Sequence, residues 1–121
     1  MIAGIGVDVV DLTRFERSVQ RTPALLERLF TTAERTLPLH SLAGRFAAKE
    51  ALIKAIGDST GVRWHDMEVV SNDLGNPSFV LHNAVAASVE ARGIDSIHLS
   101  MSHDAGIAIA YVLLESTAKG S

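Results

Sequence analysis

Residues 45–55 read Arg-Phe-Ala-Ala-Lys-Glu-Ala-Leu-Ile-Lys-Ala, a helical stretch that places one carboxylate among three cations. Glu50 and Lys54 are four positions apart and share one face of the predicted helix, and Arg45 and Lys49 share a neighbouring face. The alanines between them are small, so we expect room beside these charges for a bulky charged substrate. A carboxylate next to cations suits a metal ion and phosphates. The alternative is an ordinary exposed ion pair between Glu50 and Lys54.

The composition is that of one folded domain. The chain has 121 residues, of which 47% are hydrophobic and 21% charged, as in globular and not in disordered proteins. It has no cysteine, which excludes disulfides, thiolate metal sites and a cysteine nucleophile, and fits a reducing compartment. Its net charge of −3 argues against a nucleic-acid-binding protein, which needs clustered cations.

The amino-terminal sequence predicts no export. Residues 1–6 lack the basic opening and the long apolar run of a signal peptide. No apolar run reaches the length of about 18 residues that a membrane span needs. We therefore expect a cytoplasmic protein without a membrane span.

Glycine, proline and capping residues divide the chain into strands and helices. We expect a buried first strand whose glycines, Gly4 and Gly6, allow another backbone to approach closely. Asp11 and Asn83 are the predicted caps of two helices, and Thr31 and Glu34 form a capping box. The predicted helices cover residues 14–22, 23–30, 41–56 and 83–92, and the predicted strands cover residues 2–10, 67–72, 78–82, 96–102 and 107–114.

This order of elements, with its antiparallel hairpins, predicts the α+β class: an antiparallel sheet packed against a long central helix. We expect a single domain over residues 1–115. The small and polar residues 116–121 are predicted to form a flexible tail.

Asp8 is a carboxylate inside an apolar strand, and a buried lone charge needs a partner. One interpretation places Asp8 at the end of the strand or pairs it with Arg14. The other brings Asp8 and Glu50 together on one Mg²⁺, because magnesium prefers oxygen ligands and often uses only one or two carboxylates together with substrate phosphates.

Ser102, His103 and Asp104 look like a catalytic triad but are not one, because adjacent residues of an extended segment point in alternating directions. The hydroxyl and the imidazole could instead bind a phosphate or a nucleotide, or could be ordinary turn polarity. The histidines lack zinc-site spacing, and the chain has neither a P-loop nor a complete dinucleotide fingerprint.

Arg14, Arg17 and Arg21 are three and four positions apart and form one stripe on the first predicted helix. Such a stripe is either a solvated face or a surface that meets an acidic partner. Arg28 follows on the next predicted helix.

Four segments together resemble holo-acyl-carrier-protein synthase, the small class of 4′-phosphopantetheinyl transferases. They occur in the order found in that family and span nearly the whole chain. The larger class is a tandem duplication, and this chain has no internal repeat. The matching segments are residues 4–8 with Arg14, residues 42–51 with Lys54 and Ala55, residues 75–77, and residues 100–104.

The resemblance implies a 4′-phosphopantetheinyl transferase-like fold and an enzyme that transfers 4′-phosphopantetheine from coenzyme A to a serine of apo acyl carrier protein. Adenosine 3′,5′-bisphosphate is the other product. It also implies Mg²⁺ as cofactor, and a homotrimer with active sites at subunit interfaces. The implied setting is fatty acid biosynthesis and lipid metabolism, with a carrier of polyketide synthesis as the alternative.

The same resemblance implies roles for individual residues. Asp8 and Glu50 would bind the metal, Glu50 and Lys54 would act in catalysis, and Glu50 is a plausible base for the carrier serine. The implied coenzyme A contacts are Arg45, Lys49, Lys54, Gly75, Pro77, Ser102 and His103. The implied carrier-protein contacts are Arg14, Arg21 and Arg28.

Two interpretations from other classes remain open. One is a non-catalytic module that binds nucleotides or an acidic partner through its arginine stripe. The other is a small oligomer in which the charges are ordinary salt bridges.

Overall fold

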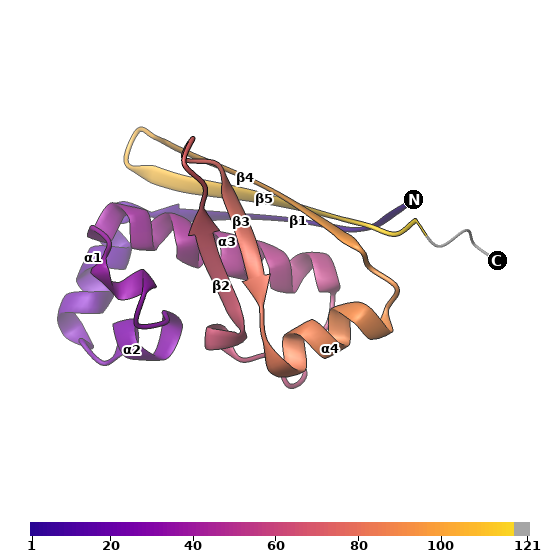
Figure 1. Ribbon diagram of the computed structural model, residues 1–121. Helices are drawn as coiled ribbons and strands as arrows, with labels where there is room; N and C mark the ends of the chain where they lie inside the picture. Colours follow the sequence, from indigo (N-terminus) through magenta and orange to yellow (C-terminus); the bar gives the residue numbers. More distant parts are fainter. Residues whose placement is uncertain (118–121) are drawn as a thin grey trace.

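The computed structural model describes residues 1–117, and its centre is one long helix beneath a three-stranded antiparallel sheet (Figure 1). Helix α3 spans Leu39–Ile56, and the sheet strands lie over it in the order β1-β5-β4. The strands span Ile2–Asp11 (β1), Ser96–Asp104 (β4) and Ile107–Glu115 (β5). The predicted α+β class, with its sheet packed against a long helix, is confirmed.

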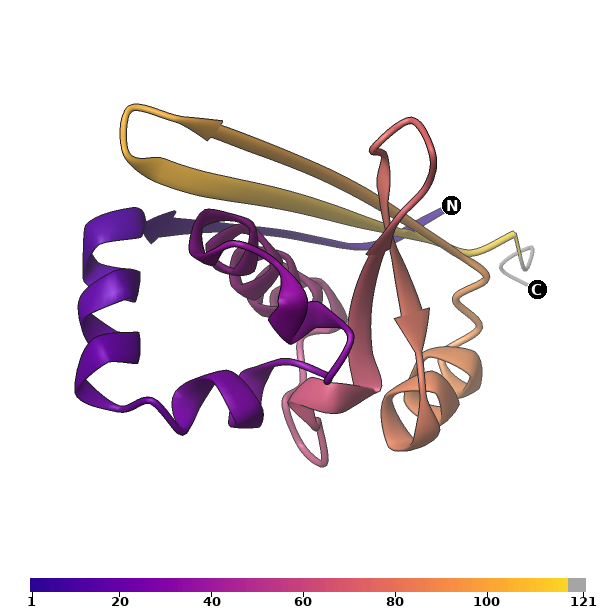
Figure 2. The same cartoon turned by 60° about the vertical axis from the view of Figure 1, so that its left-hand side comes forward.

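The smaller elements surround α3. Strands β2 (Met67–Ser71) and β3 (Pro77–Leu81) form a separate hairpin. Helices α1 (Leu12–Arg21) and α2 (Leu25–Leu29) lie at one end of the molecule and α4 (Asn83–Ala91) at the other (Figure 2). Two short 3₁₀ helices, η1 (Glu34–Thr36) and η2 (Trp64–Asp66), precede α3 and β2. Every predicted helix and strand is therefore present, with bounds that differ by a few residues.

Glycine on β1 meets alanine on α3, and this contact brings sheet and helix together. A Cβ atom at Gly6 would lie 2.0 Å from the carbonyl oxygen of Ala51, and one at Gly4 would lie 2.2 Å from that of Ala55. The predicted close backbone approach at these glycines is confirmed. The expectation that the alanines leave room for a substrate is wrong for the sheet-facing ones, because β1 occupies the space beside Ala51 and Ala55.

The expected burial of the first strand holds for only one of its faces. Gly6 and Val10 are buried against α3, whereas Ile5 and Val9 have 57% and 54% of their surface exposed. Successive side chains of a strand point to opposite faces, and the outward-facing Ile107 and Tyr111 of β5 are exposed as well. An apolar face is therefore open to solvent in the single chain.

The predicted capping interactions form at α1 and at η1. The Asp11 side chain accepts a hydrogen bond of 3.0 Å from the backbone N–H of Arg14 at the start of α1. Glu34 Oε1 accepts from the N–H of Thr31 at 2.9 Å, and Thr31 Oγ1 accepts from the N–H of Glu34 at 3.2 Å, as in a capping box. Gly57 ends α3 with a left-handed backbone, φ +82°.

The prediction that Asn83 caps the fourth helix is wrong. His82 occupies the cap position, and Asn83 is the first helical residue, with a positive φ of 48°. The Asn83 amide instead donates a hydrogen bond of 3.1 Å to Asp66 Oδ1. A tertiary contact with a residue of η2 therefore takes the polar group that the sequence assigned to local capping.

Part of the predicted tail is hydrogen-bonded. The N–H of Ser116 donates to the carbonyl of Met1 at 2.8 Å, and the N–H of Thr117 donates to the Asp95 carboxylate. The rest of the predicted tail, 118–121, lies outside the described residues. Among residues 1–117, no helix has the length and apolar character needed to cross a membrane.

Candidate active site

Asp8 projects from the helix-facing side of β1 and forms an ion pair with Lys54. The register pairs Asp8 with Ala110, which is fully buried, so Asp8 shares its face with Gly6 and Val10. Lys54 Nζ donates to Asp8 Oδ1 at 2.9 Å and to the carbonyl of Val7 at 3.1 Å. The sequence had offered Arg14 as a partner for Asp8 and Glu50 as a partner for Lys54. The structure shows neither of these two pairs.

Glu50 stands beside this pair without an ion-pair partner of its own among residues 1–117. Burial raises the pKa of the Glu50 carboxyl, the nearby Asp8 carboxylate raises it further, and the Lys54 ammonium partly offsets both. Two carboxylates thus lie close enough to affect one another, with a single ammonium nearby. A cation placed at this point would relieve their repulsion.

The donor set at this point fits a metal ion that keeps part of its shell for substrate and water. Within residues 1–117, no group of three or more His, Asp or Glu side chains could hold a metal by itself. Asp8 and Glu50 supply two carboxylates, which is the number that Mg²⁺ often takes from a protein when phosphates complete its shell. These two residues could therefore hold Mg²⁺ together with a phosphorylated substrate.

Asp8 and Glu50 line a cavity of about 570 Å³. Its floor is aromatic: the ring centroid of Phe46 lies 5.7 Å from that of Phe15 and 5.7 Å from that of Trp64. The remaining lining residues are Val9, Val10, Asp11, Arg14, Ser18, Leu25, Arg28 and Leu29. The cavity therefore combines carboxylates, an apolar floor and guanidinium groups.

The predicted carrier-facing arginines lie on α1 and α2, and two of the three line this cavity. Arg14 and Arg28 line the cavity, whereas Arg21 lies at the end of α1 and is not part of the lining. Within residues 1–117, no ion pair joins any of these three guanidinium groups to a carboxylate. They remain available to an anionic partner.

Lys49 does not contact the cavity, which corrects its predicted role at a coenzyme phosphate. Its side chain is fully buried, and Nζ donates to Glu34 Oε1 at 2.7 Å, to the carbonyl of Leu29 at 2.7 Å and to that of Trp64 at 3.2 Å. Burial lowers the pKa of the Lys49 ammonium, and its hydrogen bond to Glu34 opposes that shift. The helical spacing shared with Arg45 could not reveal these partners, because they come from distant parts of the chain.

Arg45 reaches the β2-β3 hairpin. Its Nη2 donates to Ser71 Oγ at 3.2 Å, and Ser71 pairs with Pro77 across the hairpin. Burial lowers the pKa of the Arg45 guanidinium, and its Nε is buried without a hydrogen-bond partner among residues 1–117. Arg45 and the hairpin residues Gly75 and Pro77 therefore belong to one region of the molecule.

His103 and Ser102 point to opposite faces of β4. A Cβ atom at Gly44 of α3 would lie 2.8 Å from His103 Nε2, which also bonds to the carbonyl of His40 at 3.2 Å. Ser102 lies on the outer face, in register with Ile109. The prediction that this segment is not a catalytic triad is confirmed, because the hydroxyl and the imidazole lie on different sides of the sheet.

The predicted site residues thus fall into two groups. Asp8, Glu50 and Lys54 come together beneath β1, at one edge of the sheet. Ser102 and His103 lie on β4, at the other edge, with β5 between. Ser102 and His103 therefore do not line the cavity that Asp8 and Glu50 line.

Several residues that shape the site were not singled out from the sequence. Glu34 was recognised only as half of a capping box, and the aromatic floor of the cavity was not predicted at all. The sequence does carry one signal for it, since Phe46 is four positions before Glu50 and so lies on the same helix face.

Comparison with known families identifies this architecture. The chain matches the family model described as the 4′-phosphopantetheinyl transferase superfamily over residues 4–112. It therefore belongs to that superfamily.

Relatives and solved structures agree with this assignment. The chain is 70% identical over 115 residues to the holo-[acyl-carrier-protein] synthase of Leifsonia xyli subsp. xyli, a match that covers 95% of this chain and 98% of the relative. The crystal structure of the Neisseria meningitidis synthase shares 35% identity, with a TM-score of 0.87 over 96% of this chain and 100% of that one. The Helicobacter pylori synthase, solved in complex with coenzyme A, shares 32% identity, with a TM-score of 0.82 over 92% and 99% of the two chains.

Proposed function

We propose that this protein transfers the 4′-phosphopantetheine group of coenzyme A to a serine hydroxyl of apo acyl carrier protein. The serine oxygen forms a bond to the phosphorus that carries pantetheine. The bond from that phosphorus to the bridging oxygen of the diphosphate breaks, and adenosine 3′,5′-bisphosphate leaves. The products are the holo carrier and this nucleotide, and the serine proton passes to a base.

The observation that carries this proposal is the meeting of Asp8 and Glu50 at a cavity rimmed by Arg14 and Arg28, in a member of the transferase superfamily. The carboxylates suit a metal-bound diphosphate, and the free guanidinium groups suit an acidic carrier protein. The complex of the Helicobacter pylori relative with coenzyme A supports the choice of donor.

Asp8 and Glu50 would hold Mg²⁺, which when bound offsets negative charge on the diphosphate oxygens. Glu50 is also the candidate base for the carrier serine, since it lines the cavity in which that hydroxyl would bind. Lys54 has one N–H beyond the two that it gives to Asp8 and Val7, and can direct it to the diphosphate.

The coenzyme would also contact the second group of residues. Arg45 Nε is a buried donor without a partner among residues 1–117, and it suits a phosphate oxygen. Gly75, Pro77, Ser102 and His103 would complete this part of the site. Lys49 has no part in it, because its ammonium is buried and bonded elsewhere.

A homotrimer would unite the two groups of residues, with one subunit supplying the edge at β1 and a neighbour the edge at β4. The open face of the sheet supports self-association, since it exposes Ile5, Val7, Val9, Ile107 and Tyr111 together. Fatty acid biosynthesis in the cytoplasm is the setting that this proposal implies.

The test is to incubate the purified protein with apo acyl carrier protein, coenzyme A and Mg²⁺, and to measure the mass of the carrier. We expect the mass to rise by one phosphopantetheine group, and to stay unchanged with Glu50→Gln or without divalent metal. Glu90→Gln on the exposed surface of α4 is the matched control and should behave as the unaltered protein. Coenzyme binding without any mass gain would instead favour a non-catalytic binding module.

A further inference from the structure

A buried lysine ties together three walls of the cavity. Lys49 Nζ donates to the backbone carbonyls of Leu29, in α2, and of Trp64, in η2. Both residues line the cavity. The residue that follows Lys49 on α3 is Glu50, the carboxylate at the centre of the proposed chemistry. One ammonium group thus connects three elements at the point where each contributes to the cavity.

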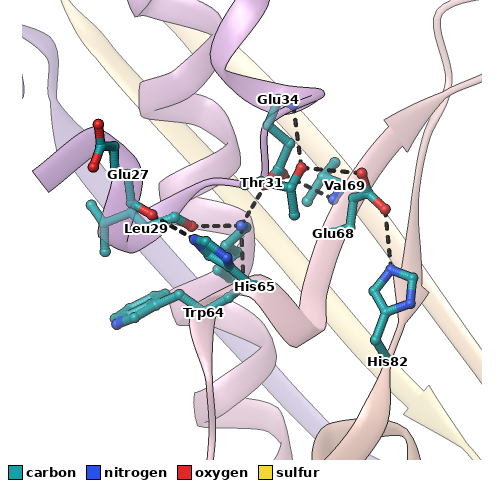
Figure 3. A network of polar contacts seen from close by, with 10 residues as sticks. Glu27, Leu29, Thr31, Glu34, Trp64, His65, Glu68, Val69 and His82 are labelled. Carbon is teal, nitrogen blue, oxygen red and sulfur yellow. Dashed lines mark hydrogen bonds and ion pairs between the residues drawn. The ribbon is translucent and has the colours of Figure 1, made fainter.

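The counter-ion of Lys49 is itself held by the backbone. Glu34 Oε1 accepts from Lys49 and from the N–H of Thr31, and Glu34 Oε2 accepts from the N–H of Val69 at 3.0 Å. Thr31 Oγ1 donates to Glu68 at 3.1 Å (Figure 3). The segment before η1 and strand β2 thus both bind the Glu34 carboxylate, which fixes the position of the counter-ion of Lys49.

This arrangement is costly for a purely structural contact. Removing a lysine and a glutamate from water carries a desolvation penalty that well-packed apolar side chains avoid. An apolar side chain at position 49 would fill the volume but would form no bond to either carbonyl. The ammonium, by contrast, forms directional hydrogen bonds. These bonds set the distance from α3 to α2 and from α3 to η2.

We propose that Lys49 is a positioning residue, whose bonds to Leu29, Trp64 and Glu34 hold Glu50 in register with the α2 and η2 walls of the cavity. This inference rests on the proposed transferase function. Lys49 acts through the placement of Glu50 relative to Arg28, the neighbour of Leu29, and has no contact with either substrate. It thereby couples the carrier-facing helix α2 to the catalytic carboxylate.

The test compares two variants. Lys49→Met removes the ammonium and leaves the Glu34 carboxylate buried without a counter-ion, which destabilises the fold. The double variant Lys49→Met with Glu34→Gln removes both charges, so its thermal stability should recover the part of that loss that comes from the unpaired carboxylate. We expect kcat to remain at least tenfold below that of the unaltered protein in the double variant, because small misplacements of catalytic groups are that costly. The KM for coenzyme A should change less than twofold.

The fluorescence of Trp64 provides a measurement that does not depend on turnover. Since Trp64 is the only tryptophan of the chain, the signal reports on this residue alone. Its emission should shift to longer wavelength, and acrylamide should quench it more, in both variants once the η2 wall loses its bond to Lys49. The matched control is Arg92→Met. Arg92 also donates from another element to a carbonyl of α3, that of Ile56 at 3.3 Å, but it lies outside the cavity lining. This control should leave kcat and Trp64 emission unchanged.

If both kcat and thermal stability recover in the double variant, the ion pair of Lys49 and Glu34 serves only to stabilise the fold. That result would overturn the proposal. Failure of both variants to fold would make Lys49 a folding determinant and overturn it as well. Absence of transfer by the unaltered protein would instead contradict the proposed function. The Trp64 measurement would then still decide whether Lys49 holds the cavity walls.

Discussion

Lys54 pairs with Asp8 of the adjacent strand at 2.9 Å, although Glu50 precedes it by four residues on the same helix. This pairing crosses from α3 to β1, so the ion pair joins the helix to the strand and leaves Glu50 without an ion-pair partner among residues 1–117. Burial is the main cause of the raised pKa of Glu50, the Asp8 carboxylate raises it further, and the Lys54 ammonium only partly offsets both.

Replacing Lys54 should impair transfer far more than folding. The pair is half-exposed on the lysine side, so Lys54→Met should cost only about 0–1 kcal/mol of stability. Loss of the donor at the diphosphate should lower kcat about a hundredfold, as measured by steady-state transfer. Lys54→Arg, which keeps the charge, is the control and should retain more activity. A Lys54→Met enzyme with full kcat would contradict a role at the diphosphate.

Glu50→Gln should stabilise the metal-free protein at neutral pH. The pKa of Glu50 is raised in the folded chain, so the folded state binds this proton more tightly than the unfolded state. The charged carboxyl therefore destabilises the fold above its folded pKa, and this cost disappears as the pH falls toward the ordinary glutamate value. Thermal unfolding should show a higher Tm for the variant at neutral pH and no difference in acid.

The same thermal unfolding measurement, repeated with Mg²⁺, tests whether Glu50 is a metal ligand. The ion should raise the Tm of the unaltered protein and have a smaller effect on Glu50→Gln, because the variant loses a carboxylate ligand. Equal stabilisation of both proteins would count against Glu50 as a ligand.

The close contact between β1 and α3 predicts that a single methyl group added at Gly6 lowers the stability of the fold strongly. A Cβ at Gly6 would meet the backbone oxygen of Ala51 at 2.0 Å, and that backbone cannot move without shifting the helix. We expect Gly6→Ala to destabilise the protein by about 1–3 kcal/mol or more in urea unfolding. Ser78→Ala at an exposed position of β3 should stay within about 0.5 kcal/mol of the unaltered protein. Equal stabilities would mean that the helix and strand are farther apart than described.

Two arginines of α1 offer a matched pair for the carrier surface. Arg14 lines the cavity, and Arg17 lies on the same helix but outside the lining. Arg14→Ala should raise the KM for the carrier about tenfold at low salt and less at high salt, since the contact is electrostatic and screened. Arg17→Ala should change it less than twofold. The same increase for both variants would indicate only a general attraction between opposite charges.

The open face of the sheet predicts the effect of a charge placed at its centre. Tyr111 is 49% exposed on β5, and Tyr111→Asp should break the proposed trimer and abolish transfer, because the two edges of the site would no longer meet. Light scattering coupled to gel filtration measures the assembly. Val80→Asp on β3, at a position 40% exposed, should leave it intact. A monomeric but fully active unaltered protein would contradict the shared site.

Local sequence signals were sufficient to predict most of the helices and strands. Asp11, the capping box of Thr31 and Glu34, and Gly57 act over three or four residues, so their outcome follows from neighbours in the chain. The capping prediction for Asn83 was wrong because its amide donates a hydrogen bond to Asp66, a residue 17 positions away in the chain. A local signal holds only where no distant group competes for it.

The sequence by itself determined the family, the order of helices and strands, and the residue types that we propose for binding a metal and phosphates. Those features depend on motifs and on periodicity. Only the tertiary structure decided the partner of each charge: Asp8 for Lys54, and Glu34 for Lys49. Helical spacing makes neighbours of residues four apart, but burial and hydrogen bonds across 46 or 15 positions of chain determine which charges meet.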